Sequence, residues 1–299
     1  MAKTIYLDHD VFVRLRRDER PGLAGHIAAF KQEEFLFTYS PAHLEEIAVI
    51  IREVQDQTEA EKRVAESIAI LSQTTGNWEF LPAEHNQGPS RLIQEDPRIC
   101  MSRVLDGYEL TLAAEENERS LMSMKSAAAF EEVYGELGAD VKAEPGVPLF
   151  ERRRAEDEIN VLAVNNLAPE NLFTDSKVLA GLGVKLWNYN YEWNLDTLPK
   201  GAELLASHKT RETVVNLVFA YLEQIGYRAD SFDKFRSRMH DVSHAIYAAA
   251  ANVVVTGDGR YLMRLRAAHR FLGLPTLPLS LDEFMAASPD DVNERMKQT

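Results

Sequence analysis

The sequence predicts an α/β protein built on a central parallel sheet. Two apolar stretches of β-favouring residues, Lys3–Leu7 and Val253–Thr256, each run into a turn that carries acidic residues, which is typical of buried central strands. A further strand is followed by Ser40-Pro41 and then by apolar residues at helical spacing. Strands that alternate with helices favour a parallel sheet, whose ligand site lies at the carboxyl ends of its strands.

Length and composition are typical of a soluble globular protein. The 299 residues suffice for one large domain or two ordinary ones, and 45% are hydrophobic while 27% are charged. No apolar run approaches membrane-spanning length and the start has no signal-peptide pattern, so we expect a cytoplasmic protein without a membrane partner. The single cysteine, Cys100, excludes an internal disulfide, and the lack of a Cys/His cluster argues against structural zinc.

Charge is unevenly distributed along the chain. The net charge of −14 argues against a protein that coats nucleic acid with a broad basic surface. Residues 228–270 nevertheless contain eight Lys or Arg and four Asp, so this segment carries +4 and the remainder −18. Such a segment is either a solvated helix face or a groove that follows phosphates beside a metal site.

The amino-terminal part, residues 1–56, alternates strands with helices. Ser40 and Pro41 have the residue types of a helix cap and a first helical position, and the apolar residues after them form one face. The elements expected here are a strand at 3–7, a helix or loop from 11, a short helix from 23 to 30, a strand at 34–39 and a helix from 41 onwards.

Residues 57–206 are long, polar and mostly helical in pattern, which predicts an insertion in the α/β domain. The alternation in the aromatic run 187–194 favours a half-buried strand; base stacking or a protein interface is the alternative. We expect the insertion to supply any surface for a protein partner or a second copy of the chain. The helices predicted here cover 59–71, 105–134, in one or two pieces, and 152–167.

The α/β pattern returns in residues 207–299. The elements expected are a helix over 214–225 closed by Gly226, an alanine-rich helix over 238–251 with Asp241 at its start, a strand at 253–256, an arginine-rich helix, an edge strand at 275–280 and a final helical turn at 281–285.

Four acidic residues are predicted to meet at one edge of the sheet. Asp8 and Asp258 follow strands, and Glu46 and Asp241 lie at helix starts near strand ends. Carboxylates that converge without matching cations repel one another, which proteins tolerate mainly to bind a divalent metal. Oxygen ligands alone favour Mg²⁺ or Mn²⁺, which serve phosphoryl chemistry.

The ordered set of motifs resembles the PIN domain of metal-dependent ribonucleases. The resemblance rests on Leu-Asp-x-Asp-Val at 7–11, Ser-x-x-x-Leu-x-Glu-Ile at 40–47, an aspartate before an alanine-rich helix, and Val-Val-Thr-x-Asp-x-x-Tyr at 254–261. It covers about 1–56 and 207–290. It implies a three-layer α/β/α domain with a central parallel sheet, interrupted by an insertion far longer than compact members contain.

The resemblance also implies an endoribonuclease that hydrolyses RNA with Mg²⁺ or Mn²⁺, in a toxin, a defence effector or a processing enzyme. Asp8, Glu46, Asp241 and Asp258 match the acidic tetrad, so they are the expected catalytic residues and metal ligands. Asp10 is expected as a further metal ligand, and Glu45 is the alternative to Glu46. The expected substrate-binding residues are Thr256, which matches a small hydroxyl position of the family, His244, which lies one helical turn after Asp241, and Arg236, Arg238, Arg260 and Arg264 of the basic segment.

Two other functions remain open at this point. Asp8-His9-Asp10-Val11 also fits the start of a haloacid-dehalogenase-like phosphatase, with Asp8 as nucleophile and Asp10 as acid/base. That family normally has an acid four residues after the last aspartate, where this chain has Leu262. The third interpretation is a PIN-like scaffold that binds RNA or a partner without cutting, against which the complete tetrad argues.

Overall fold

The computed structural model describes residues 2–83, 88–107, 164–188, 192–229 and 235–298, and only the backbone of residues 188 and 235–238. Two of the helices expected in the insertion, over 105–134 and 152–167, lie almost wholly outside the described residues. In the described part the chain is an α/β protein with a four-stranded parallel sheet and many helices.

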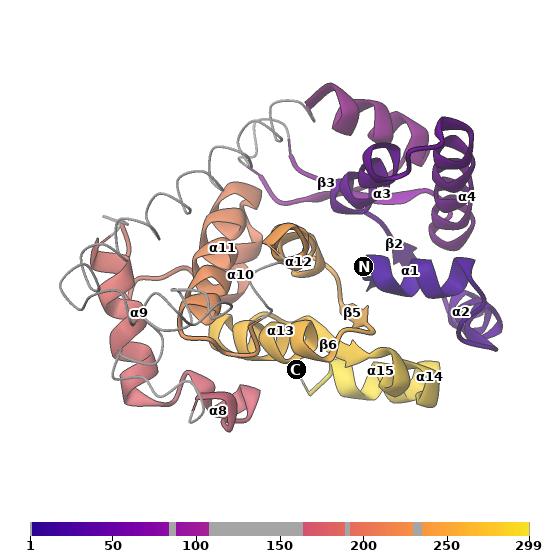
Figure 1. Cartoon of the computed structure of the whole chain (residues 1–299). Helices are drawn as coiled ribbons and strands as arrows, with labels where there is room; N and C mark the ends of the chain where they lie inside the picture. Colours follow the sequence, from indigo (N-terminus) through magenta and orange to yellow (C-terminus); the bar gives the residue numbers. More distant parts are fainter. Residues whose placement is uncertain (1, 84–87, 108–163, 189–191, 230–234, 299) are drawn as a thin grey trace, which may run out of the picture.

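The sheet has the strand order β2-β1-β5-β6 (Figure 1), with every neighbouring pair parallel. β1 (Lys3–Leu7) and β5 (Val253–Thr256) form its centre, β2 (Phe35–Thr38) lies beside β1, and β6 (Leu277–Ser280) lies beside β5. The chain therefore winds one way from β1 and the opposite way from β5. Because parallel crossovers are right-handed, the two directions place helices on opposite faces of the sheet.

Alternating side chains of the central strands separate two hydrophobic cores. Tyr6 and Val254 belong to one core, whereas Ile5, Leu7 and Val255 belong to the other. All five side chains are fully buried. This arrangement agrees with the three-layer α/β/α order that the sequence predicts.

Each core is completed by its own helices (Figure 1). The core with Ile5 and Leu7 includes residues of α1 (His9–Arg16), α2 (Leu23–Gln32), α3 (Pro41–Glu53), α4 (Gln57–Thr75), α14 (Leu281–Ala286) and α15 (Pro289–Met296). The core with Tyr6 includes residues of α8 (Pro169–Leu172), α9 (Ser176–Asn188), α10 (Gly201–Leu205), α11 (His208–Gln224), α12 (Phe235–Ala248) and α13 (Gly259–Leu272).

The described part of the insertion is not purely helical, because β3 (Trp78–Leu81) and β4 (Arg91–Gln94) form an antiparallel pair. A bridge between Tyr39 and Glu79 joins this pair to the end of β2. Glu79 is completely buried, and it accepts hydrogen bonds from Tyr39 Oη at 3.1 Å and from Arg103 at 3.0 Å. The β3–β4 pair is thus attached to the end of β2 through the backbone of Tyr39 and the buried Glu79 carboxylate, while α4 packs into the core with Ile5 and Leu7.

The local predictions are largely confirmed, with three corrections. α12 begins at Phe235, so Asp241 lies in its second turn and not at its start. Trp187 lies in the last turn of α9 and is 83% exposed, so the predicted strand at 187–194 is wrong where the structure describes it. The carboxyl-terminal helix α15, with its Ser288 cap, is an element that the sequence analysis did not predict.

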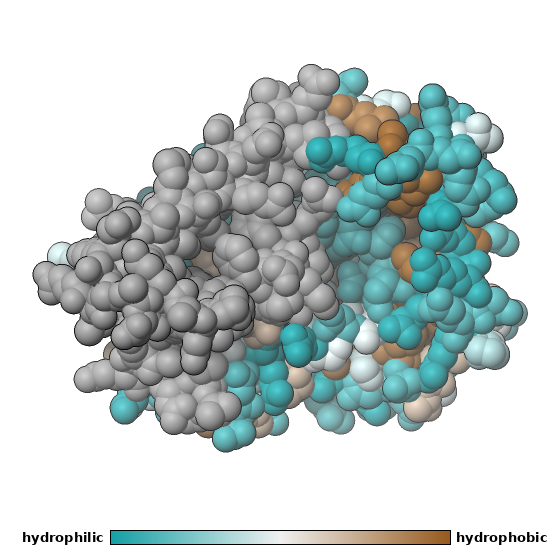
Figure 2. Space-filling model, viewed as in Figure 1, coloured by the Kyte–Doolittle hydropathy of each residue, from teal (hydrophilic) through white to brown (hydrophobic). Residues whose placement is uncertain are grey.

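The outer surface near α3 and α4 is mainly hydrophilic (Figure 2), and its apolar side chains lie in small separate patches. None of the helices among the described residues has the length and apolar character needed to cross a membrane.

Helix α3 offers a matched test of the packing. Ile47 is 2% exposed and Ile51, one turn later, is 46% exposed. We expect Ile47→Ala to lower the free energy of unfolding by about 2–5 kcal/mol, because it leaves a cavity in the core. Ile51→Ala should change it by less than about 1 kcal/mol. Urea denaturation measures both; equal losses would contradict the packing described.

Candidate functional site

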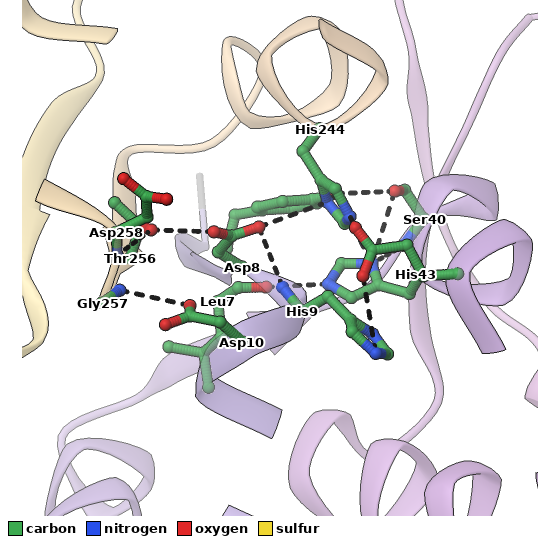
Figure 3. A network of polar contacts seen from close by, with 12 residues as sticks. Leu7, Asp8, His9, Asp10, Ser40, His43, His244, Thr256, Gly257 and Asp258 are labelled. Atoms are coloured by element: carbon green, nitrogen blue, oxygen red, sulfur yellow. Dashed lines mark hydrogen bonds and ion pairs between the residues drawn. The ribbon is translucent and has the colours of Figure 1, made fainter. Parts of the chain in front are cut away.

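The candidate site lies between the carboxyl ends of β1 and β5, where the winding of the sheet reverses (Figure 3). In open α/β sheets this switch point leaves a crevice outside the strand ends. Asp8 directly follows β1, and its backbone N–H donates to Val255 O of β5 at 2.8 Å. Asp258 follows β5 after one glycine. The sheet itself therefore brings the first and last predicted acids to one edge.

Asp8 is the most constrained of the acids. It is 8% exposed and caps α1, with Oδ1 accepting from His9 N at 2.9 Å and Oδ2 accepting from Thr256 Oγ1 at 2.7 Å. Burial raises the pKa of Asp8 well above its usual value, and the nearby charges of Asp10, Glu46 and Asp241 raise it further. The Thr256 hydrogen bond opposes this rise. Ionised Asp8 is thus held in an excess of negative charge.

Asp10 packs against the turn after β5. Its Oδ1 accepts from Gly257 N at 3.1 Å and its Oδ2 from Arg14 Nε at 3.3 Å. Burial raises the pKa of Asp10, while the Gly257 and Arg14 hydrogen bonds lower it. An added Cβ at Gly257 would lie 2.2 Å from Asp10 Oδ2, so a larger residue here would displace the Asp10 carboxylate.

Glu46 faces two imidazoles, which distinguishes it from Glu45. Its Oε2 lies 3.5 Å from His9 Nε2 and its Oε1 lies 3.2 Å from His244 Nε2. Burial lowers the pKa of His9 to about 4 and that of His244 to about 3, so both rings are neutral near pH 7. The carboxylate of Glu46 therefore faces two neutral imidazoles and no cationic one.

A buried polar network behind Glu46 was not found from the sequence. Tyr6 Oη lies 2.7 Å from both Ser40 Oγ and His244 Nδ1. His43 donates from Nε2 to Leu7 O at 2.7 Å, and its Nδ1 accepts from Ser40 N at 3.1 Å. The only sequence signal was that Tyr6 alternates with Ile5 and Leu7, which places it on the face toward α12.

Asp241 is paired with a buried arginine. Arg264 is 2% exposed; its Nη2 donates to Asp241 Oδ2 at 2.6 Å, and its Nη1 lies 3.7 Å from Glu223. The expected role of Arg264 in substrate binding is therefore corrected, because its guanidinium is buried against these acids. Tyr261 is also fully buried near Asp8 and Asp241, and its hydroxyl has no hydrogen-bond partner among the described residues.

Asp258 is exposed and caps α13. Its Oδ1 accepts from Arg260 N at 2.7 Å and from Tyr261 N at 2.9 Å, and its own N–H donates to Thr256 Oγ1 at 3.0 Å. Thr256 thus connects the two acids that follow the central strands, since its hydroxyl also donates to Asp8.

Two more of the expected substrate-binding residues are placed differently. Thr256 and His244 are at most 1% exposed, so they position carboxylates and do not form a surface for substrate. Arg260 is exposed at the start of α13 beside Asp258. The side chains of Arg236 and Arg238 lie outside the described residues.

The residues fit a hard divalent cation in their chemistry. Carboxylate oxygens dominate the donor set, and the buried Tyr261 hydroxyl has no partner among the described residues. Asp10 and Asp241 are paired with Arg14 and Arg264, whereas Asp8 and Glu46 have only histidines as ion-pair partners within the described ranges. Within the described ranges no three His, Cys, Asp or Glu side chains already form a metal-holding group. Side-chain rotation would therefore have to accompany metal binding.

Comparisons of the chain with protein-family models, curated proteins and solved structures returned no match.

Two glycines near Asp258 provide a sharp test of the packing between Asp10 and the β5 turn. Gly257→Ala should lower the melting temperature by several degrees, because its Cβ would clash with Asp10. Gly259→Ala, at a position where an added Cβ would have nothing within 4 Å, should leave it unchanged or raise it, because alanine favours the helix. Differential scanning calorimetry measures both melting temperatures. Equal changes in the two variants would contradict the position described for Asp10.

Asp8 should destabilise the metal-free protein as pH rises. Its folded-state pKa is raised, so its stabilising contribution is complete below the unfolded pKa of about 3.9 and is lost as pH rises toward the folded pKa. Asn is as good a cap as Asp, so Asp8→Asn removes the charge and keeps the cap. In EDTA we expect Asp8→Asn to melt higher than wild type at pH 7, with a smaller difference at pH 4. A lower melting temperature at pH 7 would make Asp8 a purely structural cap.

Proposed function

We propose that the protein is a metal-dependent endoribonuclease of the PIN-like type, which hydrolyses phosphodiester bonds of RNA at the switch-point crevice. One observation carries the proposal: Asp8, Asp10, Glu46 and Asp241 are close enough that three negative charges raise the pKa of the fourth. Such an arrangement is unfavourable without a cation and is useful with one.

The residues that would hold Mg²⁺ or Mn²⁺ are Asp8, Asp10, Glu46 and Asp258, with Asp241 behind them. When bound, the ion supplies positive charge that activates water and offsets the charge of the phosphodiester. The two imidazoles beside Glu46 are neutral near pH 7, so neither competes with a metal ion for its carboxylate as a cation would. Asp258 has one carboxylate oxygen engaged by the α13 backbone and is exposed at the rim, where substrate would arrive.

The remaining groups position these acids. Thr256 fixes Asp8, the Gly257 N–H and Arg14 fix Asp10, and Arg264 fixes Asp241. Tyr6 holds His244 against Glu46. Arg260 follows Asp258 by two residues and Arg14 contacts Asp10, and both side chains retain solvent exposure, so they are the proposed contacts to RNA phosphates.

Two observations disfavour the phosphatase alternative. Leu262, where that family would place a second acid, is a buried side chain 6% exposed. In addition, both oxygens of Asp8 already accept hydrogen bonds, from His9 N and Thr256, which suits a fixed ligand better than an attacking nucleophile.

The test is cleavage of a mixed pool of single-stranded RNA with Mg²⁺ or Mn²⁺, followed by mapping of the cut ends. Asp8→Asn and Asp258→Asn should each lower the rate by at least about 100-fold, because each removes a charge from the metal site. The control Asp196→Asn changes an exposed aspartate with no side-chain hydrogen bond among the described residues and should cut at the wild-type rate.

Four outcomes would contradict the proposal. Cleavage in EDTA, or equal rates for Asp8→Asn and wild type, would exclude the metal mechanism. Covalent phosphate on Asp8 after incubation with a phosphomonoester would favour the phosphatase. RNA binding without cleavage at any metal concentration would leave the scaffold interpretation.

A further inference from the structure

Arg211 is a buried cation that the proposed nuclease does not use. It is 1% exposed, and it forms no ion pair with an Asp or Glu of the described residues. Its Nε has no hydrogen-bond partner in this part of the chain. An arginine stays charged even when buried, and burying a charge without a counter-ion is strongly unfavourable.

The neighbours of Arg211 are donors or neutral groups. Its Nη2 donates to Ser90 Oγ and, at 2.9 Å, to His208 Nδ1. Ser90 Oγ also lies 3.0 Å from His208 Nδ1. His208 therefore accepts at Nδ1 and carries its proton on Nε2. Burial and the Arg211 charge lower the pKa of His208 to about 4. The cluster of Ser90, His208 and Arg211 thus holds one positive charge and no negative charge.

This cluster lies at the amino terminus of α11, a helix of 17 residues. The helix dipole places positive charge there, so a cation in the first turn is unfavourable and an anion is favourable. The first turn contains no acidic residue, and Lys209 adds an exposed second cation. Ser207 Oγ caps Thr210 N and His208 N donates to Gly88 O, whereas Lys209 N makes no hydrogen bond to a described residue.

We propose that the amino terminus of α11 is a binding site for a phosphate group. The buried guanidinium, the Ser90 hydroxyl, the protonated Nε2 of His208 and the Lys209 N–H are the kinds of donor that surround a tetrahedral oxyanion. Ser90 is half-buried and Lys209 is exposed, so the cluster is open to solvent at its rim.

The phosphate site is separate from the acidic site but close to it. The His208 ring packs on Tyr247, with ring centroids 5.3 Å apart. Tyr247 follows His244 by three residues on α12, so it lies one helical turn from the imidazole beside Glu46. The charge and contacts of Arg211 and its cluster do not depend on nuclease activity, so the phosphate site can exist whether or not the acidic site cuts RNA.

The first test uses inorganic phosphate and the full-length protein in EDTA. Phosphate should raise the melting temperature more than chloride of equal ionic strength, by mass action. Arg211→Gln should weaken the calorimetrically measured phosphate affinity by about tenfold or more. Lys297→Gln, which removes an exposed cation just after α15, is the matched control and should leave it unchanged.

A second readout separates an anion site from a structural arginine. Without phosphate, Arg211→Met should melt at or above the wild-type temperature, because a buried unpaired charge is replaced by an apolar side chain. With phosphate the order should reverse. If neither arginine variant folds, Ser90→Ala and His208→Gln each remove one donor and should each weaken phosphate binding.

Two sources of the phosphate group are distinguished with the Asp8→Asn protein. Tighter binding of a 5′-phosphorylated than of a 5′-hydroxyl oligoribonucleotide, with the difference lost in Arg211→Gln, assigns the site to an RNA end. Equal binding of both oligonucleotides, with AMP retained by wild type and lost in Arg211→Gln, assigns it to a free nucleotide. Equal effects of phosphate and chloride on wild type and on every variant would overturn the proposal.

Discussion

The hydrogen bond from Thr256 to Asp8 is the contact on which the site depends. It joins the ends of β1 and β5, two strands that are almost the whole length of the chain apart in sequence, at the point where the sheet reverses its winding. The acids around Asp8 repel its negative charge, and the Thr256 hydrogen bond partly offsets this by favouring the ionised form. Thr256 also accepts from Asp258 N, so one hydroxyl sets the spacing of the first and last acids. The meeting of Asp8 and Asp258 at this edge is therefore a consequence of the sheet topology and of one side chain.

Neutral histidines preserve the charge of this site. A protonated imidazole beside Glu46 would cancel its charge and weaken attraction for a cation. Burial keeps His9 and His244 neutral near pH 7, with pKa values of about 4 and about 3. Tyr6 and Ser40 satisfy the buried polar atoms behind them without adding charge. Neutral imidazoles thus contact Glu46, whereas arginine side chains contact Asp10 and Asp241.

The elements that follow from local sequence were predictable, and the long-range pairings were not. Strand β1, the Ser40-Pro41 helix start and the short strand β5 depend on neighbouring residues, and each was found. The hydrogen bond between Arg264 and Asp241 depends on how α12 and α13 pack, which the sequence does not reveal. Arg264 was therefore predicted only as one member of a basic segment. Asp241 was misplaced at a helix start because an aspartate before an alanine-rich run has the pattern of a cap, whereas α12 already includes Phe235.

The acidic site and the Arg211 cluster have charges of opposite sign, and α12 contacts both, through His244 beside Glu46 and through Tyr247 beside His208. With a net charge of −14 the protein repels polyanions at long range, so affinity for a phosphate has to arise at short range. A surface lysine or arginine is screened at physiological ionic strength, whereas a buried guanidinium without a carboxylate is screened far less. Arg211 meets this requirement better than the basic segment, in which Arg266 is partly exposed and already paired with Glu283. Recognition of phosphate by such a chain would therefore be local, and weakly dependent on salt compared with binding through a broad basic surface.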